Sequence, residues 1–386
     1  MTKAGRESGR LLSYQAPVCY HRVVKTNTYQ ITKFLKAHWL TVSFFLGFIT
    51  DFLLLNQIDN LVDNLILFFY VTTATFSLWL FYVGAAKRGP RFLHHLFYRY
   101  APLLMQYSFG GLLSGMLIFY GRSGDLIASF PFLLLIFLVI LGNEFVAKRS
   151  DRLVYQLTLY FIGLFSYVVL VVPVLIGKMG DGIFIFSGLL ALVLVTFVVQ
   201  VLFRIVPNFM ALNVKKVILS IGFVYILFNV LYFTALIPPI PLSLTKLEVV
   251  QKVDSFSNSS GLKTYRLVYE KQPWYRRLPF VDSVIHPVYG SVSCFARIYA
   301  PTKLSTKVYH RWEYQDTNGD WQTKQVIDYR IKGSNRKGYG GYTKIGKFWS
   351  GKWRCQVETE RGQVLGRKEF RIDTDSKPKD LKVKVE

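Results

Sequence analysis

Two cysteines in the C-terminal third have the most closely specified chemistry in this sequence. In "SVSCFARI" Cys294 alternates with Ala296, and in "KWRCQVE" Cys355 alternates with Trp353. Because alternate residues of a strand share a face, both thiols are expected on the interior side of a sheet. They form a disulfide if their Cα atoms lie within about 7 Å, or remain two buried, inert thiols. No His or Asp arrangement accompanies either thiol, so we predict no catalytic residue.

Four charged side chains lie within or beside long apolar segments, where ionisable groups are costly and often functional. They are Asp51, Arg122, Asp125 and Glu144. We expect solvation at a membrane interface for the last three. Asp51 either faces a polar cavity or pairs with Arg122, or it extends outward to water. If Asp51, Arg122 and Asp125 converged on one outward-facing cavity, the chain would be a transporter or a membrane-embedded enzyme acting on a lipid-linked substrate.

Aromatic and basic residues near predicted turns form the candidate binding surface. Trp321 and Trp349 lie beside turns, in a segment that also contains Arg330 and Arg336. Such a surface can bind sugar rings, phosphate groups or a protein partner. The alternative is a solvated basic face above anionic lipid headgroups.

Three other side chains of this part fit interior positions by alternation. Trp312 and Trp353 are predicted to belong to the core. His310 alternates with Trp312, and we expect it to be a hydrogen-bonded core residue rather than a ligand or a base.

Seven apolar segments are long enough to position the intramembrane residues, since a spanning helix needs about 20 apolar residues. They run over residues 38–58, 61–83, 103–121, 126–146, 153–177, 183–203 and 217–237. Within "FGGLLSGM", Gly111 and Gly115 lie four residues apart, a spacing that lets helix backbones approach closely. We therefore predict a bundle of about seven transmembrane helices with a tight contact at these glycines.

The positions of the basic residues predict how these segments cross a membrane. Lys and Arg are frequent in the tail before residue 37 and in every second connection, whereas the alternate connections contain only Arg122 and Lys178. Because basic loops remain cytoplasmic, the N-terminus is predicted to be cytoplasmic. Seven crossings then place the C-terminal part outside the cytoplasm of a multi-pass inner (cytoplasmic) membrane protein.

The polar C-terminal third is predicted to be all-β. From Leu242 onward there are 28 Lys and Arg against 15 Asp and Glu, in a chain of net charge +24. Runs such as "KTYRLVYE" and "KVYHRWEY" alternate polar and apolar residues between frequent turns, which is typical of an antiparallel sandwich. No nucleic-acid-binding motif accompanies the charge, so no nucleic-acid partner is predicted. The predicted organisation is a basic cytoplasmic tail (1–36), a transmembrane domain (37–238), a Pro-rich stalk (239–244), a sandwich-like domain (245–373) and a charged tail (374–386).

Motifs near the C-terminus resemble a known family. They are a His-x-Trp pair at His310 and Trp312, a Gly-x-Trp-Arg strand at Gly351, Trp353 and Arg354, a turn from Gly362 to Gly366, and a closing strand with Phe370. This combination is similar to domain of unknown function 2914, a small bacterial extracytoplasmic β domain. The helical part is similar to the multi-helix region that precedes this domain in some bacterial proteins. The resemblance implies a β fold, a membrane setting and a bacterial origin, and it implies no reaction.

The function expected from these observations is binding. The chain is predicted to be a membrane protein that presents a β-sandwich outside the cytoplasm to an envelope protein or a glycan. We expect no cofactor and no metal, and the lipid bilayer is the other expected partner. The transporter or lipid-linked enzyme, with the β domain as its lid, remains the alternative.

Overall fold

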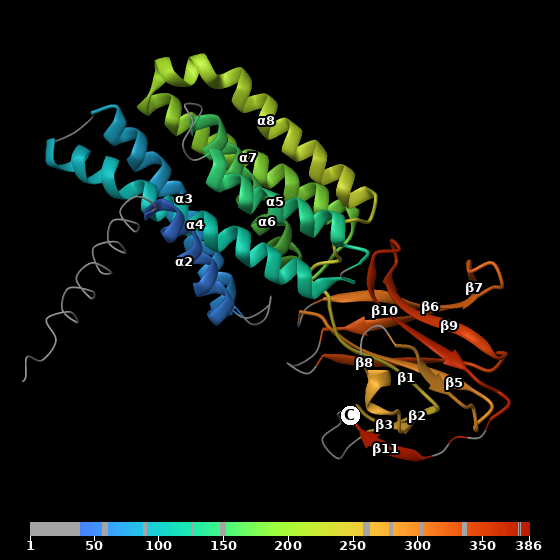
Figure 1. Cartoon of the computed structure of the whole chain (residues 1–386). Helices are drawn as coiled ribbons and strands as arrows, with labels where there is room; N and C mark the ends of the chain where they lie inside the picture. Colours follow the sequence, from blue (N-terminus) through green and yellow to red (C-terminus); the bar gives the residue numbers. More distant parts are fainter. Residues whose placement is uncertain are drawn as a thin grey trace, which may run out of the picture.

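The computed structural model describes residues 39–55, 61–87, 91–125, 127–146, 152–257, 263–277, 281–301, 304–333, 338–376, 378 and 380–386. The predicted cytoplasmic tail (1–36) and Arg336 lie outside these residues. The described chain forms a bundle of helices followed by a β region at one end of the bundle (Figure 1).

Seven helices make up the first part of the described chain. They are α2 (Trp39–Leu54), α3 (Leu61–Ala85), α4 (Arg91–Ser123), α5 (Phe130–Val146), α6 (Arg152–Ile176), α7 (Asp181–Ile205) and α8 (Pro207–Phe233). Each of them overlaps one of the apolar segments of the sequence, because an uninterrupted apolar run satisfies its backbone within a helix. Pro207 occupies the first turn of α8, where the missing N–H costs little.

Five of these helices are long and apolar enough to cross a membrane, which indicates that the protein is associated with one. They are α3, α4, α6, α7 and α8. The prediction of seven spans is not supported, because α2 has 16 residues and α5 has 17. At about 1.5 Å per residue both are shorter than the ~30 Å hydrocarbon layer. Helix α4 is mostly buried within the bundle, whereas α7 and α8 expose many large apolar side chains.

Glycines allow α2 and α3 to pack closely on α4. A Cβ at Gly110 would overlap the carbonyl of Phe44 in α2, and one at Gly111 would overlap the ring of Tyr70 in α3. A Cβ at Gly115 would meet the side chain of Leu67. The small residues therefore lie at the contact between these helices, where backbones approach closely.

Eleven strands make up the described β region. They are β1 (Ser243–Val250), β2 (Lys252–Ser257), β3 (Lys263–Glu270), β4 (Ser283–Ile285), β5 (Val292–Tyr299), β6 (Ser305–Gln315), β7 (Trp321–Lys332), β8 (Tyr339–Ile345), β9 (Gly351–Thr359), β10 (Val364–Ile372) and β11 (Leu381–Val385). A short 3₁₀ helix, η1 (Trp274–Arg277), follows β3. All pairings of the described strands are antiparallel except β4 with β10, which is parallel.

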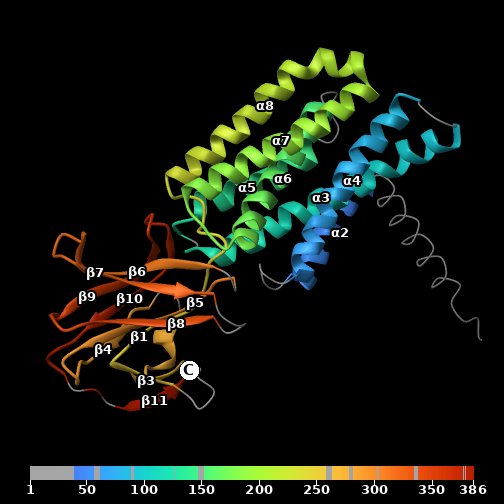
Figure 2. The same ribbon diagram turned by 180° about the vertical axis from the view of Figure 1, so that it is seen from behind.

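The strands form three sheets in three layers, as both views show (Figures 1 and 2). The outer sheet has the order β4-β10-β9-β6-β7, the middle sheet β1-β5-β8 and the small sheet β11-β3-β2. Strand β5 is buried along nearly its whole length. It is covered on both sides, since Cys294 faces the outer sheet at Cys355 and Phe295 contacts Tyr265 of the small sheet. The predicted sandwich therefore has a third layer.

Two predicted segments differ in the structure. The Pro-rich segment 239–244 is not a stalk, because Pro239–Leu242 are buried where the helices and the β region meet. Ile240 joins the helical core and Leu242 joins a core of the β region. The predicted charged tail (374–386) contains β11, which pairs with β3 from Leu381 to Val385.

Candidate functional site

A cavity of about 540 Å³ lies where edges of the three sheets meet. Its lining residues come from β1 and the residue after it, β3 and the following segment, η1, β4, β10 and β11: Leu247, Glu248, Val249, Val250, Gln251, Tyr269, Glu270, Gln272, Arg276, Ser283, Ile285, Lys368 and Lys384. Strands β1, β4 and β11 are edge strands of their sheets. The volume is in the range of sites that hold small ligands, about 300–1,000 Å³.

Two glutamines fasten the chain segment that forms one wall of the cavity. Gln251 is almost fully buried, donates to the carbonyl of His286 at 2.7 Å and accepts from the N–H of Val288 at 3.2 Å. Gln272 donates to the carbonyl of Val284 at 2.7 Å. These bonds connect β4 and its flanking residues to β1 and β3. The wall is therefore fixed by bonds to the backbone rather than by apolar packing alone.

Lys368 and Arg276 give the cavity a positive character. Lys368 lies on the same side of β10 as Phe370 and Ile372, which are buried in the core. Strand alternation therefore points the side chain of Lys368 toward the interior. At this position β1 is the edge strand of the middle sheet, and the cavity lies beside it. Neither Lys368 nor Arg276 has an ion pair with a carboxylate among the described residues.

The two carboxylates of the cavity have partners of their own. Glu270 lies 2.8 Å from Nδ1 of His286, and Nε2 of His286 lies 3.5 Å from Asp373. Glu248 pairs with Lys246 at 3.4 Å, where its side chain is partly exposed. Among the described residues, neither carboxylate forms an ion pair with Lys368 or Arg276.

Sequence reasoning did not identify this site. The available signal was Lys368 in "GRKEFRI", two residues before Phe370 in an alternating strand, since Lys is rare at an interior position. The meeting of three sheet edges depends on pairing between distant strands, and no local pattern predicts it.

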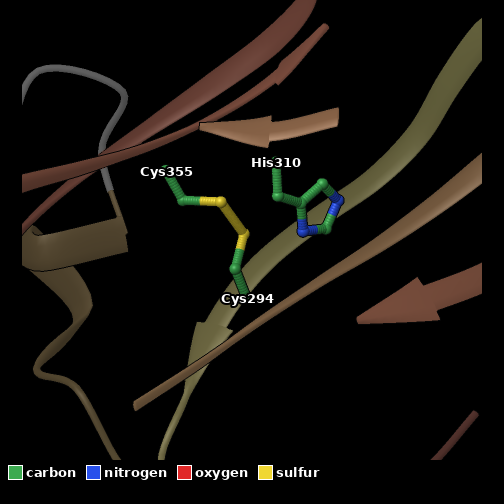
Figure 3. A group of neighbouring side chains, drawn as sticks. All are labelled: Cys294, His310 and Cys355. Carbon is green, nitrogen blue, oxygen red and sulfur yellow. A yellow bond between two sulfur atoms is a disulfide. The ribbon is translucent and has the colours of Figure 1, made fainter. Parts of the chain in front are cut away.

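Cys294 and Cys355 form a disulfide in the core between the outer and the middle sheet, with His310 beside it (Figure 3). Their Cα atoms are 6.6 Å apart. The two sulfurs and the imidazole are close enough together to hold a metal ion only if the disulfide is reduced. In the disulfide form neither sulfur is a thiolate, so the group does not fit a metal site.

His310 is hydrogen-bonded at both ring nitrogens. Nδ1 lies 2.9 Å from the hydroxyl of Thr343, and Nε2 lies 2.8 Å from the hydroxyl of Tyr329. The indole N–H of Trp312 donates to the same Thr343 hydroxyl at 3.0 Å. Burial lowers the pKa of His310 from 6.5 to about 3, so the imidazole is neutral. This row of polar side chains is satisfied within the core.

The three predicted surface residues that the structure describes, Trp321, Trp349 and Arg330, do not form one site. Trp349 is 43% exposed but packs against Tyr314 and Trp353 on the interior side of the outer sheet, with Lys324 over its ring at 5.3 Å. Trp321 lies on the opposite face, under Arg354 at 4.2 Å, since Arg354 precedes the inward Cys355 in β9. Cationic side chains therefore lie over both rings.

Arg330 is far from both tryptophans. It lies nine residues after Trp321 in β7, about 30 Å along the strand, and it is exposed. Arg336 is outside the described residues. The predicted aromatic and basic surface is therefore corrected to separate features at the two ends of the outer sheet.

Asp51 is fully buried at the contact of α2, α3 and α4. Its carboxylate accepts a hydrogen bond from Tyr70 at 2.7 Å and from Ser114 at 2.6 Å. It neither extends to water nor pairs with Arg122, which donates to the carbonyl of Leu55 at 3.4 Å. Gly111 accounts for this geometry, because its missing side chain leaves room for the ring of Tyr70.

Asp125 connects the helices to the β region instead of facing solvent. It accepts from Arg367 of β10 at 2.9 Å, and its own N–H donates to the carbonyl of Val364 at 3.1 Å. Burial would raise the pKa of Asp125, but the bonds from Arg367 and from the N–H groups of Ala128 and Ile127 outweigh burial and lower it. Asp51, Arg122 and Asp125 thus do not converge on one cavity. Glu144 lies in α5, and its side chain is outside the described part of the chain.

The turn between β9 and β10 adds further contacts with the helices. Arg361 forms an ion pair with Asp181 at the start of α7, and its guanidinium lies 4.3 Å from the ring centre of Tyr232 in α8. Gln363 donates to the carbonyl of Ile237 at 2.8 Å. On the other side, Ser243 donates to the carbonyl of Arg122 at 2.7 Å. The β region is therefore docked on the bundle through directed polar contacts.

Comparisons with known proteins identify part of the β region. Residues 305–372, which extend from β6 to β10, match the family described as "Protein of unknown function (DUF2914)". The match includes His310, Cys355 and Lys368 and leaves out the helices and Cys294. No curated protein matches the chain.

A search of solved structures gave an alkylpurine DNA glycosylase, AlkC, from Pseudomonas fluorescens, bound to DNA with an abasic site analogue. The identity is 12%, each chain is covered over 78%, and the TM-score is 0.20. A likeness this weak carries no argument about the present chain. The family that the comparisons identify is therefore that of residues 305–372, whose description assigns no function.

Proposed function

We propose that this chain is a multi-pass membrane protein that holds a ligand-binding β region against the extracytoplasmic side of the membrane. The observation that carries the proposal is the cavity of about 540 Å³ at the edges of three sheets, with three basic side chains in its wall. Among the described residues, the hydroxyl of Ser283, which lines the cavity, forms no hydrogen bond with a base that could activate it, and this favours binding over a reaction.

The docking contacts support this reading, because they fix how the β region is presented. The turn between β9 and β10 meets the helices, and the opposite end of these strands, with Trp353 and Ile372, points away from the bundle. Basic residues gather in the alternate helix connections on the other side of the bundle, which favours a cytoplasmic location for that side. Arg122 and Lys178 lie at the end that carries the β region.

The proposal is tested by asking what the cavity retains when the intact protein is purified from membranes. Native mass spectrometry is expected to detect a bound small molecule on the wild type and to lose it on Ile285→Trp, which fills the cavity with a larger ring. Val326→Trp is the matched control, since Val326 is 44% exposed on β7 and outside the cavity. The same molecules on all three proteins, or none on the wild type, would contradict the proposal.

A second candidate function, signalling across the membrane, is favoured by one observation on β10. Lys368 lines the cavity, and its neighbour Arg367 bonds to Asp125 beside α4. A ligand that moved β10 would therefore act directly on a contact with the helices. Spin labels at Lys332 and Leu212 are expected to change their separation on ligand addition under this candidate, and to keep it under simple binding.

A further inference from the structure

We infer that the cavity binds a small organic anion, a phosphate or a carboxylate attached to a sugar-sized body. The inference rests on the proposed function and names the ligand class for the same site. Its basis is the unbalanced charge of the lining, together with the shape and place of the cavity.

The charges of the lining favour an anion. Lys368 and Arg276 face the cavity from two different walls, β10 and η1, and neither has a carboxylate partner among the described residues. Glu270 is held by His286, and Glu248 by Lys246. Lys384, the third cation, is paired with Glu386 at 2.9 Å and half exposed. An anionic ligand would supply the partner that Lys368 and Arg276 lack, through charge-assisted hydrogen bonds.

The rest of the lining favours an organic body over a bare ion. Leu247, Val249 and Ile285 contribute an apolar wall, and Tyr269 contributes an aromatic ring. A cavity of about 540 Å³ is far larger than an inorganic anion needs. The amides of Gln251 and Gln272 are already bonded to the backbone, so they shape the wall rather than recognise the ligand.

The place of the cavity argues for a soluble ligand. Ser243 contacts the end of α4, and the cavity begins at Leu247 and continues beyond Val250 along β1. At about 3.3 Å per residue, the near end of the cavity lies up to roughly 13 Å along β1 from the contact with α4. This separation from the helices favours a soluble anion over a lipid headgroup as the ligand.

The inference is tested by isothermal titration calorimetry, which measures how tightly each probe binds to the full chain in detergent. Glucose 1-phosphate and glucuronate are the anionic probes, glucose is the neutral probe of matched size, and inorganic phosphate tests whether the body is needed. Both anionic sugars are expected to bind, glucose and phosphate to bind at least about tenfold more weakly, and salt to weaken the anions. Lys368→Met and Arg276→Gln should each reduce anion binding about tenfold or more, while Lys332→Met, an exposed lysine of β7, should leave it unchanged.

The possible results separate this inference from the proposed function. Equal binding of glucose and the anions, with no effect of Lys368→Met, would overturn the anion assignment and leave a binding cavity. No binding by any probe to a folded wild type would overturn the anion assignment, and an empty cavity in native mass spectrometry would overturn the binding function as well. Unchanged thermal unfolding of Lys368→Met shows that lost binding is not lost folding.

Discussion

The helical and the β regions bury their carboxylates in different ways. In the bundle, Asp51 is enclosed by the hydroxyls of Tyr70 and Ser114, with no basic partner among the described residues. On the outer sheet, Glu358 pairs with Arg311 and Glu313 with Arg354, each at 2.6 Å. A guanidinium inside an apolar bundle would cost more than a hydroxyl, whereas at a partly wet sheet face its charge stays hydrated. Close packing therefore stabilises the helical bundle. Ion pairs and the Cys294–Cys355 disulfide stabilise the β region.

Removal of the disulfide is expected to give the largest difference between the two regions. Replacing Cys294 and Cys355 by Ser removes a link between residues 61 apart and is expected to lower the free energy of unfolding of the β region by about 4 kcal/mol. Guanidinium unfolding followed by tryptophan fluorescence measures this loss, because five of the seven tryptophans lie after Leu242. Helical ellipticity should keep its midpoint. A loss shared equally by both signals, or no loss, would contradict the separation of the two regions.

The next effect is the pH dependence that His310 imposes on the β region. Its pKa is 6.5 in the unfolded chain and about 3 when folded, so below pH 6.5 the unfolded chain binds the extra proton. The neutral imidazole contributes fully to the free energy of unfolding above pH 6.5. This contribution is lost as the pH falls toward 3, by about 1.4 kcal/mol per pH unit. At two pH units below 6.5, the free energy of unfolding is therefore lower by about 2.7 kcal/mol. The His310→Gln variant should be less stable at neutral pH, and its free energy of unfolding, measured by chemical denaturation, should change less with pH. The same slope in the variant and the wild type would show that His310 is not the cause of the pH dependence.

A smaller effect is expected where the helices pack. Gly111→Ala places a methyl group against the ring of Tyr70 and should destabilise the bundle by about 2 kcal/mol, in thermal unfolding followed by helical ellipticity. Gly222→Ala in α8 is the control, because a Cβ there meets no atom within 4 Å. Alanine favours helix over glycine, so the control should be neutral or stabilising. Equal behaviour of the two variants would show that α3 and α4 do not meet at Gly111.

The smallest effect concerns the contact between the regions. A double-mutant cycle with Asp125→Asn and Arg367→Gln should give a coupling of about 1 kcal/mol, since both side chains are largely buried. The pKa of Asp125 is below its usual 3.8, so this coupling is present above pH 3.8 and is lost as pH falls through the lower folded value. Urea unfolding at several pH values measures it. Strict additivity at neutral pH would mean that the two residues do not interact.

The lengths of the apolar segments predicted which parts of the chain are helical. They predicted the first residues of the helices less accurately. Helix α4 begins at Arg91, twelve residues before the predicted segment, because "RFLHHLFYRY" is helical but too polar for a hydropathy criterion. Pro102 therefore lies inside α4. The enclosed geometry of Asp51 was not predictable, since it depends on Tyr70 and Ser114 from two other helices.

The β region shows where local patterns stop being informative. Alternation correctly placed Trp312, Trp353 and both bridged cysteines in the interior. It did not give the third sheet, because β11 pairs with β3 across more than a hundred residues and its "LKVKV" resembles a solvated tail. Strands β1 and β11 each supply part of the cavity wall, together with β3, η1, β4 and β10. The site thus follows from tertiary pairing and not from a motif.

The central claim is that the docked β region, with its cavity, lies outside the cytoplasm. The most direct measurement is a pair of fusions after Glu386, one with alkaline phosphatase, active only outside, and one with green fluorescent protein, fluorescent only inside. We expect phosphatase activity without fluorescence, and the reverse for the same reporters inserted after Val206, between α7 and α8. Fluorescence of the fusion after Glu386, with no phosphatase activity, would contradict it.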